Sequence, residues 1–261
     1  MTALRIGRID ESFYQVVGGV VAEVLRRHGN DVTVFDGTHT EVYNALGAGE
    51  IDLAVAFWLP YGHAAAWHRL SDTVEELATL YDGAKFFWAM PAYVDERIRS
   101  IADLSSSELA RGVPRAIKGL SLDATITTAS QMAIIDYDLT AVGFSLEPGD
   151  FETWEASLDL AVAAKQPVVL PLWEPYYLNA KYDLRILADP KGVLGPVNRV
   201  VLGARRDVGG RVGDETVAAL RSTGLSLAIV SELDRRVHIE RRTPDEVATA
   251  WVATKLSERV P

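Results

Sequence analysis

The chain has 261 residues, 48% of them hydrophobic and 24% charged, so it can bury a sizeable core and is not a disordered polypeptide. Its formal net charge of −10 argues against nucleic acid and anionic membranes as partners, because both would repel it. The absence of cysteine excludes disulfides, thiolate metal sites and a cysteine nucleophile. Length alone predicts about one or two domains.

The first sixty residues alternate between patterns typical of strands and of helices. Apolar residues at helical spacing over 16–25 follow Ser12 and Gln15, which together predict a capping box at the start of a helix. A second capping box, formed by Thr38 and Glu41, predicts another helix. The resulting β-α-β-α-β order indicates a parallel sheet with right-handed crossovers. The strands are expected at residues 4–9, 31–35 and 51–58.

Strand and helix patterns continue through the rest of the chain. A crossing strand is expected over 85–94, and a buried strand over 167–173 ends in tryptophan. The residues 188–198 contain two prolines and two glycines and predict an exposed loop. The last helix is expected to begin at a capping box formed by Thr243 and Glu246. Further elements are expected at 97–104 (a turn and short helix), 117–139 (a strand leading into a helix), 155–164 (a helix) and 199–204 (a strand).

Two of the six tryptophans, Trp58 and Trp173, end apolar strands, and each is followed two residues later by proline. In α/β sheets, ligands bind beyond the carboxyl ends of the strands, so these indoles are expected to face a ligand. Indole faces attract a quaternary ammonium ion with about 0.5–2 kcal/mol each. The alternative, that a tryptophan merely packs in the core, is retained for Trp67 and Trp251, and both interpretations stay open for Trp154.

Around these residues the sequence resembles the glycine betaine, choline and proline-betaine binding proteins of ABC transporters. The resemblance spans nearly the whole chain. Trp58 and Trp173 stand at the positions of two cage walls, and Trp88 at a position that faces the cleft. The segments that carry the resemblance are GAGEIDLAVAFWLPYGHAAAW (47–67), FFWAMPAYVDERIRSIADL (86–104), LWEPYYLNAKYDLRILADPKGV (172–193) and TPDEVATAWV (243–252).

The resemblance implies an α/β, two-lobed periplasmic-binding-protein fold of type II, with crossing strands and a cleft between the lobes. Lobe 1 would comprise residues 1–89 and 198–261, and lobe 2 residues 90–197. The expected function is non-catalytic capture of a quaternary amine, without cofactor or metal, for a permease and its ATPase. The candidate ligand-binding residues are Trp58, Trp173, Tyr176, Trp88, Trp154, Tyr177, His63 and Asp123.

Two departures from the family pattern bear on the ligand. Many members have a histidine after the W-x-P segment, where this chain has Tyr176 and Tyr177, and many have a glycine-rich turn where this chain has SLDAT (121–125). Since Asp123 would repel a ligand carboxylate, we hypothesise a ligand without one, such as choline or trimethylamine oxide, with Asp123 near the cation or hydroxyl. The alternative is that Asp123 merely caps the following helix.

Other functions find less support in the sequence. His63 and His68 are five residues apart, which is not the helical spacing of a metal pair, and the chain lacks nucleotide-binding glycine motifs. A cytoplasmic sensor or an enzyme on the same scaffold, or a receptor for another cationic solute, remain the alternative functions.

The chain shows no apolar stretch approaching the roughly 20 residues of a membrane span. Its start, MTALRIGRID, lacks the basic and apolar regions of a secretory signal. We therefore expect a periplasmic or extracellular location if a signal has been removed, and a cytoplasmic one if Met1 is the native start.

Overall fold

The structure is a computed structural model that describes residues 2–122 and 124–257. Contacts within the chain divide it into two compact units. Unit 1 consists of the chain up to Ala84, the three-residue segment Pro175–Tyr177 and the chain from Asn198 onward. Unit 2 consists of Lys85–Glu174 and Leu178–Val197. Each unit therefore contains segments that are distant in sequence.

Unit 1 is built on a mixed sheet with the strand order β2-β1-β3-β9-β4. The first three strands are parallel, as the β-α-β-α-β pattern predicts, and Ile6 of β1 pairs with both Val34 and Leu53. The remaining two strands are antiparallel to their neighbours. The strands are β1 (Ala3–Ile9), β2 (Asp31–Gly37), β3 (Leu53–Leu59), β4 (Val74–Pro91), which continues into unit 2, and β9 (Asn198–Arg205).

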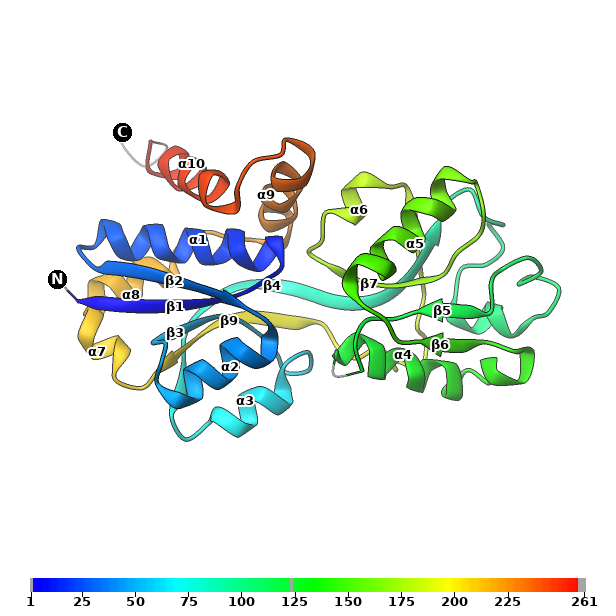
Figure 1. Cartoon of the computed structure of the whole chain (residues 1–261), viewed down its shortest axis with the longest axis horizontal. Coiled ribbons are helices and arrows are strands. Elements are labelled where there is room, and N and C mark those ends of the chain that lie inside the picture. Colours follow the sequence, from blue (N-terminus) through cyan, green and yellow to red (C-terminus); the bar gives the residue numbers. More distant parts are fainter. Residues whose placement is uncertain (1, 123, 258–261) are drawn as a thin grey trace. The chain divides into compact units, whose positions relative to one another are not determined.

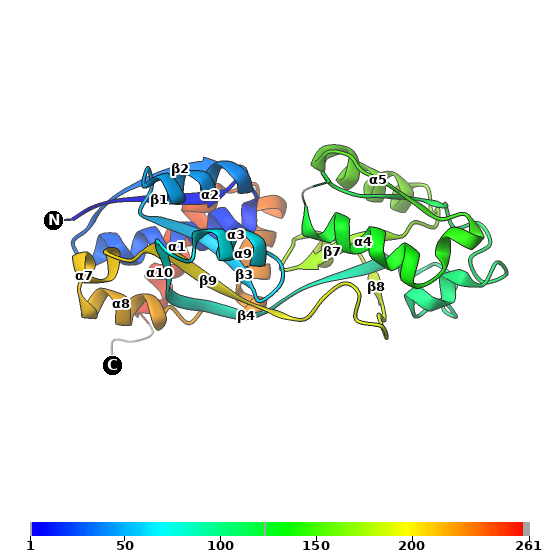
Figure 2. The same cartoon turned by 90° about the horizontal axis from the view of Figure 1, so that it is seen from below.

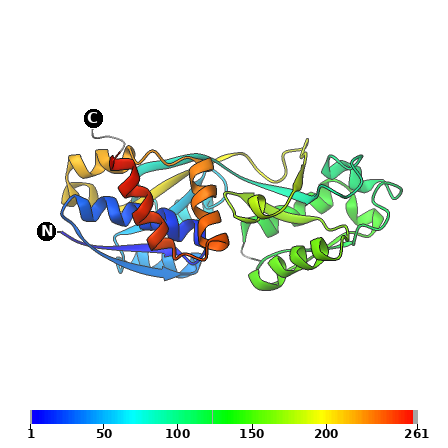
Figure 3. The same ribbon diagram turned by 90° about the horizontal axis from the view of Figure 1, so that it is seen from above.

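Helices cover both faces of this sheet. Helix α1 (Ser12–Arg27) lies on one face, and α2 (His39–Ala48) and α3 (Ala64–Leu70) lie on the other (Figures 1 and 2). Helices α9 (Leu227–Ile239) and α10 (Pro244–Ser257) pack against α1, and Figure 3 shows α10 crossing over it. The shorter α7 (Val208–Val212) and α8 (Asp214–Arg221) complete the unit.

Two of the three predicted capping boxes are confirmed. Thr38 and Glu41 cap α2 reciprocally, and Thr243 and Glu246 do so at α10. The box predicted at Ser12 is wrong: Glu11 is the N-cap of α1 and makes no side-chain cap hydrogen bond. The Ser12 hydroxyl instead donates to a carboxylate of α9, an acceptor 222 residues away that local sequence cannot reveal.

Strand β4 and the region after β9 differ most from the sequence expectation. The crossing strand was expected over 85–94, but β4 begins at Val74. Its first half, VEELATLYDGA, carries several acids and a glycine, a composition that disfavours strands. Helices α7, α8 and α9 were not predicted.

Unit 2 surrounds the second half of β4. The antiparallel strands β7 (Leu170–Glu174) and β8 (Leu184–Leu187) pair with β4, and β5 (Ala116–Lys118) pairs with β6 (Ser145–Glu147) in parallel. Helix α4 packs on β6 and β7. The helices are η1 (Ile101–Ser105), α4 (Thr125–Asp136), η2 (Leu139–Val142), α5 (Phe151–Ala163), which begins four residues earlier than predicted, and α6 (Leu178–Lys181).

Candidate functional site

Unit 1 gathers aromatic side chains at the carboxyl end of its parallel strands. Trp58 lies near the end of β3, and Phe13 and Tyr14 lie in the first turn of α1. The Trp58 ring centroid is 6.1 Å from that of Phe13 and 6.2 Å from that of Tyr14. Tyr176 meets Phe13 edge to face, with 6.3 Å between the centroids. The structure therefore brings two predicted cage residues, Trp58 and Tyr176, to the same phenylalanine. We call these four residues the unit 1 aromatic cluster.

His63 adjoins this cluster as a neutral imidazole. The Trp58 backbone N–H donates to His63 Nδ1 at 2.9 Å, and the His63 backbone N–H donates to the Trp58 carbonyl at 2.9 Å. Because Nδ1 accepts a hydrogen bond, it carries no proton. Burial lowers the pKa of His63 well below its ordinary value, and nearby His39 adds to this effect. The side chain thus fixes the turn after β3 without adding positive charge.

Glu11 supplies a half-buried carboxyl group close enough to Tyr14 of this cluster to affect the pKa of its hydroxyl. Burial, together with the charges of the neighbouring Asp234 and Asp10, raises the pKa of Glu11 to about 8. Its Oε1 lies 3.9 Å from Nδ1 of His39. The sequence contained a signal for this residue, since Glu11 follows β1, and β1 and β3 end at the same sheet edge because they are parallel.

Unit 2 holds a second aromatic group. The rings of Trp154 on α5 and Trp173 on β7 are stacked, with centroids 5.0 Å apart and planes at 17°. Phe151 lies 5.5 Å from Trp154 and 6.2 Å from Trp173. Trp154 is anchored because its Nε1–H donates to the Pro171 carbonyl at 3.2 Å. The sequence left the role of Trp154 open and did not single out Phe151, which begins α5.

The remaining predicted site residues have different surroundings. Trp88 lies in the hydrophobic core of unit 2, where its Nε1–H donates to Ser130 Oγ at 2.8 Å. Tyr177 stacks on His238 of α9 and also meets Tyr176 of the unit 1 aromatic cluster edge to face, with 5.0 Å between the ring centroids. Asp123 lies outside the described residues. Nearby, Thr127 is fully buried, and its hydroxyl accepts a hydrogen bond from the Leu120 backbone N–H at 3.0 Å.

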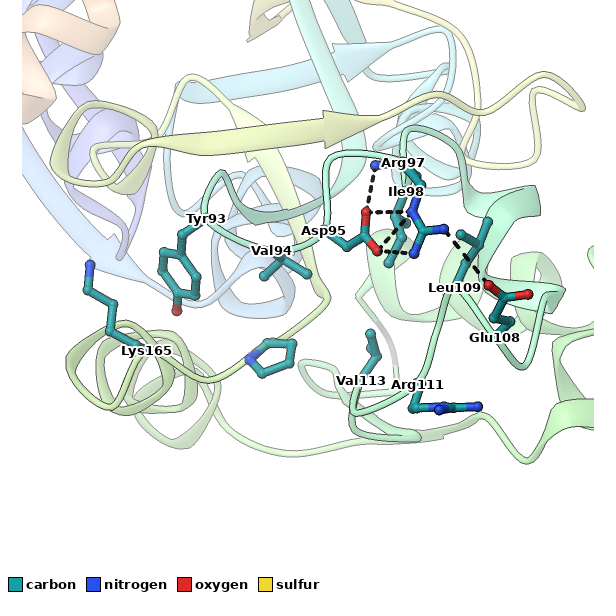
Figure 4. A pocket seen from close by; sticks show the side chains of 11 residues that line it. Tyr93, Val94, Asp95, Arg97, Ile98, Glu108, Leu109, Arg111, Val113 and Lys165 are labelled. Carbon is teal, nitrogen blue, oxygen red and sulfur yellow. Dashed lines mark hydrogen bonds and ion pairs between the residues drawn. The ribbon is translucent and has the colours of Figure 1, made fainter.

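A cavity of about 460 Å³ in unit 2 has the wrong electrostatics for a cation (Figure 4). Arg97, Arg111 and Lys165 line it together with Asp95 and Glu108. The Lys165 ammonium already lies 4.9 Å from the ring centroid of Tyr93, the aromatic residue of this lining. Figure 4 shows Asp95 and Glu108 both engaged by Arg97. A quaternary ammonium ion would find neither a vacant carboxylate nor an uncovered cage here.

Neither a metal centre nor a membrane span is evident in the part of the chain that the structure describes. No group of three or more histidine, aspartate or glutamate side chains is arranged to hold a metal ion among residues 2–122 and 124–257. Within the same residues, no helix is long and apolar enough to cross a bilayer.

Comparison with known proteins identifies the family. A family model described as the substrate-binding domain of the ABC-type glycine betaine transport system (OpuAC) matches residues 2–254, so the chain belongs to this family. A curated relative is the glycine betaine/carnitine transport binding protein GbuC of Listeria monocytogenes serotype 1/2a (strain 10403S), 30% identical over 96 residues. That alignment covers 37% of this chain and only 32% of GbuC.

Solved structures confirm the predicted fold. Lactococcal OpuAC, closed on glycine betaine, is 23% identical with a TM-score of 0.84, over 99% of this chain and 98% of that one. ProX of Borrelia burgdorferi is 22% identical in sequence, with a TM-score of 0.82, and the match covers 98% of this chain and 94% of ProX. An ABC-transporter choline-binding protein in complex with choline is 20% identical, with a TM-score of 0.80, and the match covers 98% of this chain and 89% of that one. The chain thus has the α/β, two-lobed periplasmic-binding-protein fold that its sequence predicts.

Proposed function

We propose that this protein binds a small quaternary ammonium or methylated amine, such as glycine betaine or choline, for uptake by an ABC transporter. The observation that carries the proposal is the unit 1 aromatic cluster beside the Glu11 carboxyl group. Aromatic faces attract a cation through the ring quadrupole, and the ammonium methyl groups need no hydrogen-bond acceptors. Several such faces are sufficient for micromolar binding after the entropic cost of association.

The stacked indoles of Trp154 and Trp173 are proposed to supply further aromatic surface. A stacked pair presents a rigid indole face whose position is set by its partner, and the Trp154 hydrogen bond to Pro171 restrains that partner. Rigid aromatic surfaces bind with little loss of side-chain entropy. We therefore propose Trp173 as a ligand-binding residue of unit 2, and Trp58 and Tyr176 as ligand-binding residues of unit 1.

The carboxyl groups around the unit 1 aromatic cluster favour a ligand with net positive charge. Glu11 is close enough to Asp234 for their charges to interact, and His63 is neutral. A cation beside Glu11 would favour its ionisation, whereas the carboxylate of a zwitterion would oppose it. We therefore extend the hypothesis made for Asp123 and propose choline-like cations ahead of zwitterions.

Family membership and the relatives support a role in transport rather than catalysis. The relatives named above are described as transport binding proteins, and two of the solved structures hold glycine betaine or choline. By analogy, we propose a membrane permease and its ATPase as partners, no enzymatic activity, and a periplasmic or extracellular location.

Isothermal titration with choline, glycine betaine, carnitine and trimethylamine oxide tests the proposal, with tryptophan fluorescence followed in parallel. We expect micromolar binding of a cation that shifts the emission. In Trp58→Ala and Trp173→Ala we expect a loss of at least about tenfold in affinity, since each removes a cation–π face. Trp251→Phe is the matched control, because Trp251 lies half-buried on α10 and contributes to neither aromatic group. The absence of heat with all four ligands would contradict the assignment.

A further inference from the structure

Segment Pro175–Tyr177 belongs to unit 1, although the residues on both sides of it belong to unit 2. Two of its side chains make aromatic contacts within unit 1. Tyr176 meets Phe13 edge to face at 81°. Tyr177 lies flat against the imidazole of His238, with 3.6 Å between the ring centroids and 5° between the planes.

His238 is itself held by a hydrogen-bonded chain that reaches the start of α1. Ser12 Oγ lies 2.5 Å from Asp234 Oδ1 and 2.7 Å from His238 Nε2. A carboxylate only accepts hydrogen bonds, so the single hydroxyl proton goes to Asp234. The Ser12 oxygen must then accept the Nε2–H of His238, which fixes the protonation of that nitrogen. Asp234, four residues before His238 on the same face of α9, is fully buried.

The two sets of contacts meet at the unit 1 aromatic cluster. Ser12 directly precedes Phe13, the ring that Tyr176 contacts. The hydrogen-bonded chain therefore ties α9 to the turn of α1 that carries Phe13 and Tyr14 of this cluster. Tyr176 is in turn the immediate neighbour of the residue that stacks on His238. A displaced His238 would release Tyr177, and with it the ring of Tyr176.

We infer that His238 is a positioning residue for the ligand site: held by Ser12 and Asp234, it clamps Tyr177 so that Tyr176 stays against Phe13 as a wall of the cage. This inference rests on the proposed function, because it assigns a purpose to the clamp only if Tyr176 meets the ligand. His238 itself is not assigned a contact with the ligand. The clamp depends on the flat ring for stacking and on the Nε2–H for orientation.

Two substitutions at His238 separate stacking from mere structural support. His238→Ala removes the ring, and we expect it to weaken cation binding about tenfold, comparable to losing one aromatic face. His238→Phe restores a flat ring for Tyr177 without the hydrogen bond, and we expect it to recover affinity to within about threefold of the wild type. The melting temperature of each variant is measured alongside, because a general loss of stability would lower both together.

A spectroscopic signal from Tyr177 reports the contact with His238 without any measurement of ligand affinity. With 3-fluorotyrosine at position 177, the fluorine resonance should shift in His238→Ala and return towards the wild-type position in His238→Phe. Ser12→Ala keeps the imidazole but removes the link to Asp234, and we expect an intermediate loss of affinity. Tyr93→Phe is the control, since Tyr93 belongs to unit 2 whereas α9 belongs to unit 1.

The outcomes distinguish this inference from the proposed function. The wild type could bind a cation and Trp58→Ala abolish binding while His238→Ala binds as tightly as the wild type. In that case the positioning role of His238 is wrong, and the proposed aromatic cage is still supported. If affinity follows melting temperature, with His238→Phe as weak as His238→Ala, His238 has only a structural role and the inference is overturned. If the wild type binds none of the cations, the proposed function fails and the positioning role fails with it.

Discussion

Glu11 occupies the N-cap of α1, between the end of β1 and the aromatic residues of the first helical turn. A carboxyl group at a helix N-terminus is ordinarily stabilised as the anion. Here the effect of burial outweighs that of the helix N-terminus. The charges of Asp234 and Asp10 act in the same direction as burial, so the pKa of Glu11 rises to about 8. The folded protein therefore holds a neutral carboxyl group at pH 7 where the unfolded chain would carry a charge.

This difference makes the stability of the protein depend on pH. Between the ordinary value of 4.5 and the folded value of about 8, the unfolded state loses the Glu11 proton while the folded state keeps it. Stability linked to this group is thus fully present below pH 4.5 and is lost as the pH rises towards 8. The Gln side chain in Glu11→Gln cannot ionise. We therefore expect this variant to have a higher melting temperature than the wild type at pH 8 and the same melting temperature near pH 4. The exposed Glu50→Gln serves as control, and an equal offset at every pH would contradict the assignment.

Ligand binding should respond to the same carboxyl group with the opposite trend. A cation beside Glu11 favours the ionised form, so binding releases a proton at neutral pH and tightens as the pH rises through about 8. We expect titrations with choline to show this increase in the wild type and a flat profile in Glu11→Gln. Titrations in buffers of different ionisation enthalpy report the released proton directly. A flat wild-type profile would place the cation away from Glu11.

At the scale of elements, one arginine ties together β1, β2 and α10. Arg8 of β1 is almost fully buried, and its guanidinium donates two hydrogen bonds of 2.7 Å to Asp36 and one of 2.6 Å to Asp245. A bidentate pair of this kind fixes geometry as well as charge. The guanidinium stem passes over Gly18 of α1, where an added Cβ would lie 2.3 Å from the Arg8 Cδ atom.

Gly18→Ala should therefore destabilise unit 1 even though alanine favours helices. The new methyl group must displace the buried Arg8 side chain, which strains its ion pairs with Asp36 and Asp245. Overpacking of this kind costs about 1–3 kcal/mol. Gly210→Ala is the matched control: no atom lies within 4 Å of a Cβ at that helical position, so alanine should be neutral or slightly stabilising. Chemical denaturation of both variants measures the difference. Equal stability of the two would show that Arg8 moves aside without cost.

The sequence predicts correctly those helices and strands that are determined by residues close together in the chain. The continuous apolar run of β3 and the capping box of α2 depend on neighbouring residues, and both appear as expected. The family was likewise recognisable, because the segments around Trp58 and Trp173 resemble it by themselves, and the family match confirms it.

What the sequence did not predict depends on contacts between distant residues. The first half of β4 is a strand because β9 pairs with it, despite its acidic residues. Ser12 does not cap α1, because Asp234 offers it a buried acceptor. The contact of Tyr177 with His238 joins residues 61 positions apart, which no spacing rule would bring together.

At the scale of the whole molecule, the net charge of −10 creates a field that attracts cations from a distance. Unlike the cage, this field acts before contact and affects the rate of association more than its final strength. It is also screened by salt, since the Debye length falls from about 10 Å at 0.1 M ionic strength to about 3 Å at 1 M. A cationic ligand and a zwitterionic ligand should therefore differ in how salt affects their capture.

We expect the association rate of choline to fall about two- to fivefold between low salt and 0.5 M salt. The positive charge of choline is attracted by the field of the acidic protein, and the added ions screen that field. Glycine betaine has no net charge, so its association rate should change little over the same range and serves as the control. Stopped-flow mixing with tryptophan fluorescence measures both rates. Dissociation should depend on salt far less for either ligand, because the proposed cage would hold the cation among aromatic rings that largely exclude water and salt. A salt-independent association rate for choline would mean that capture depends only on the groups around the cage, and that the acidity of the chain serves solubility alone.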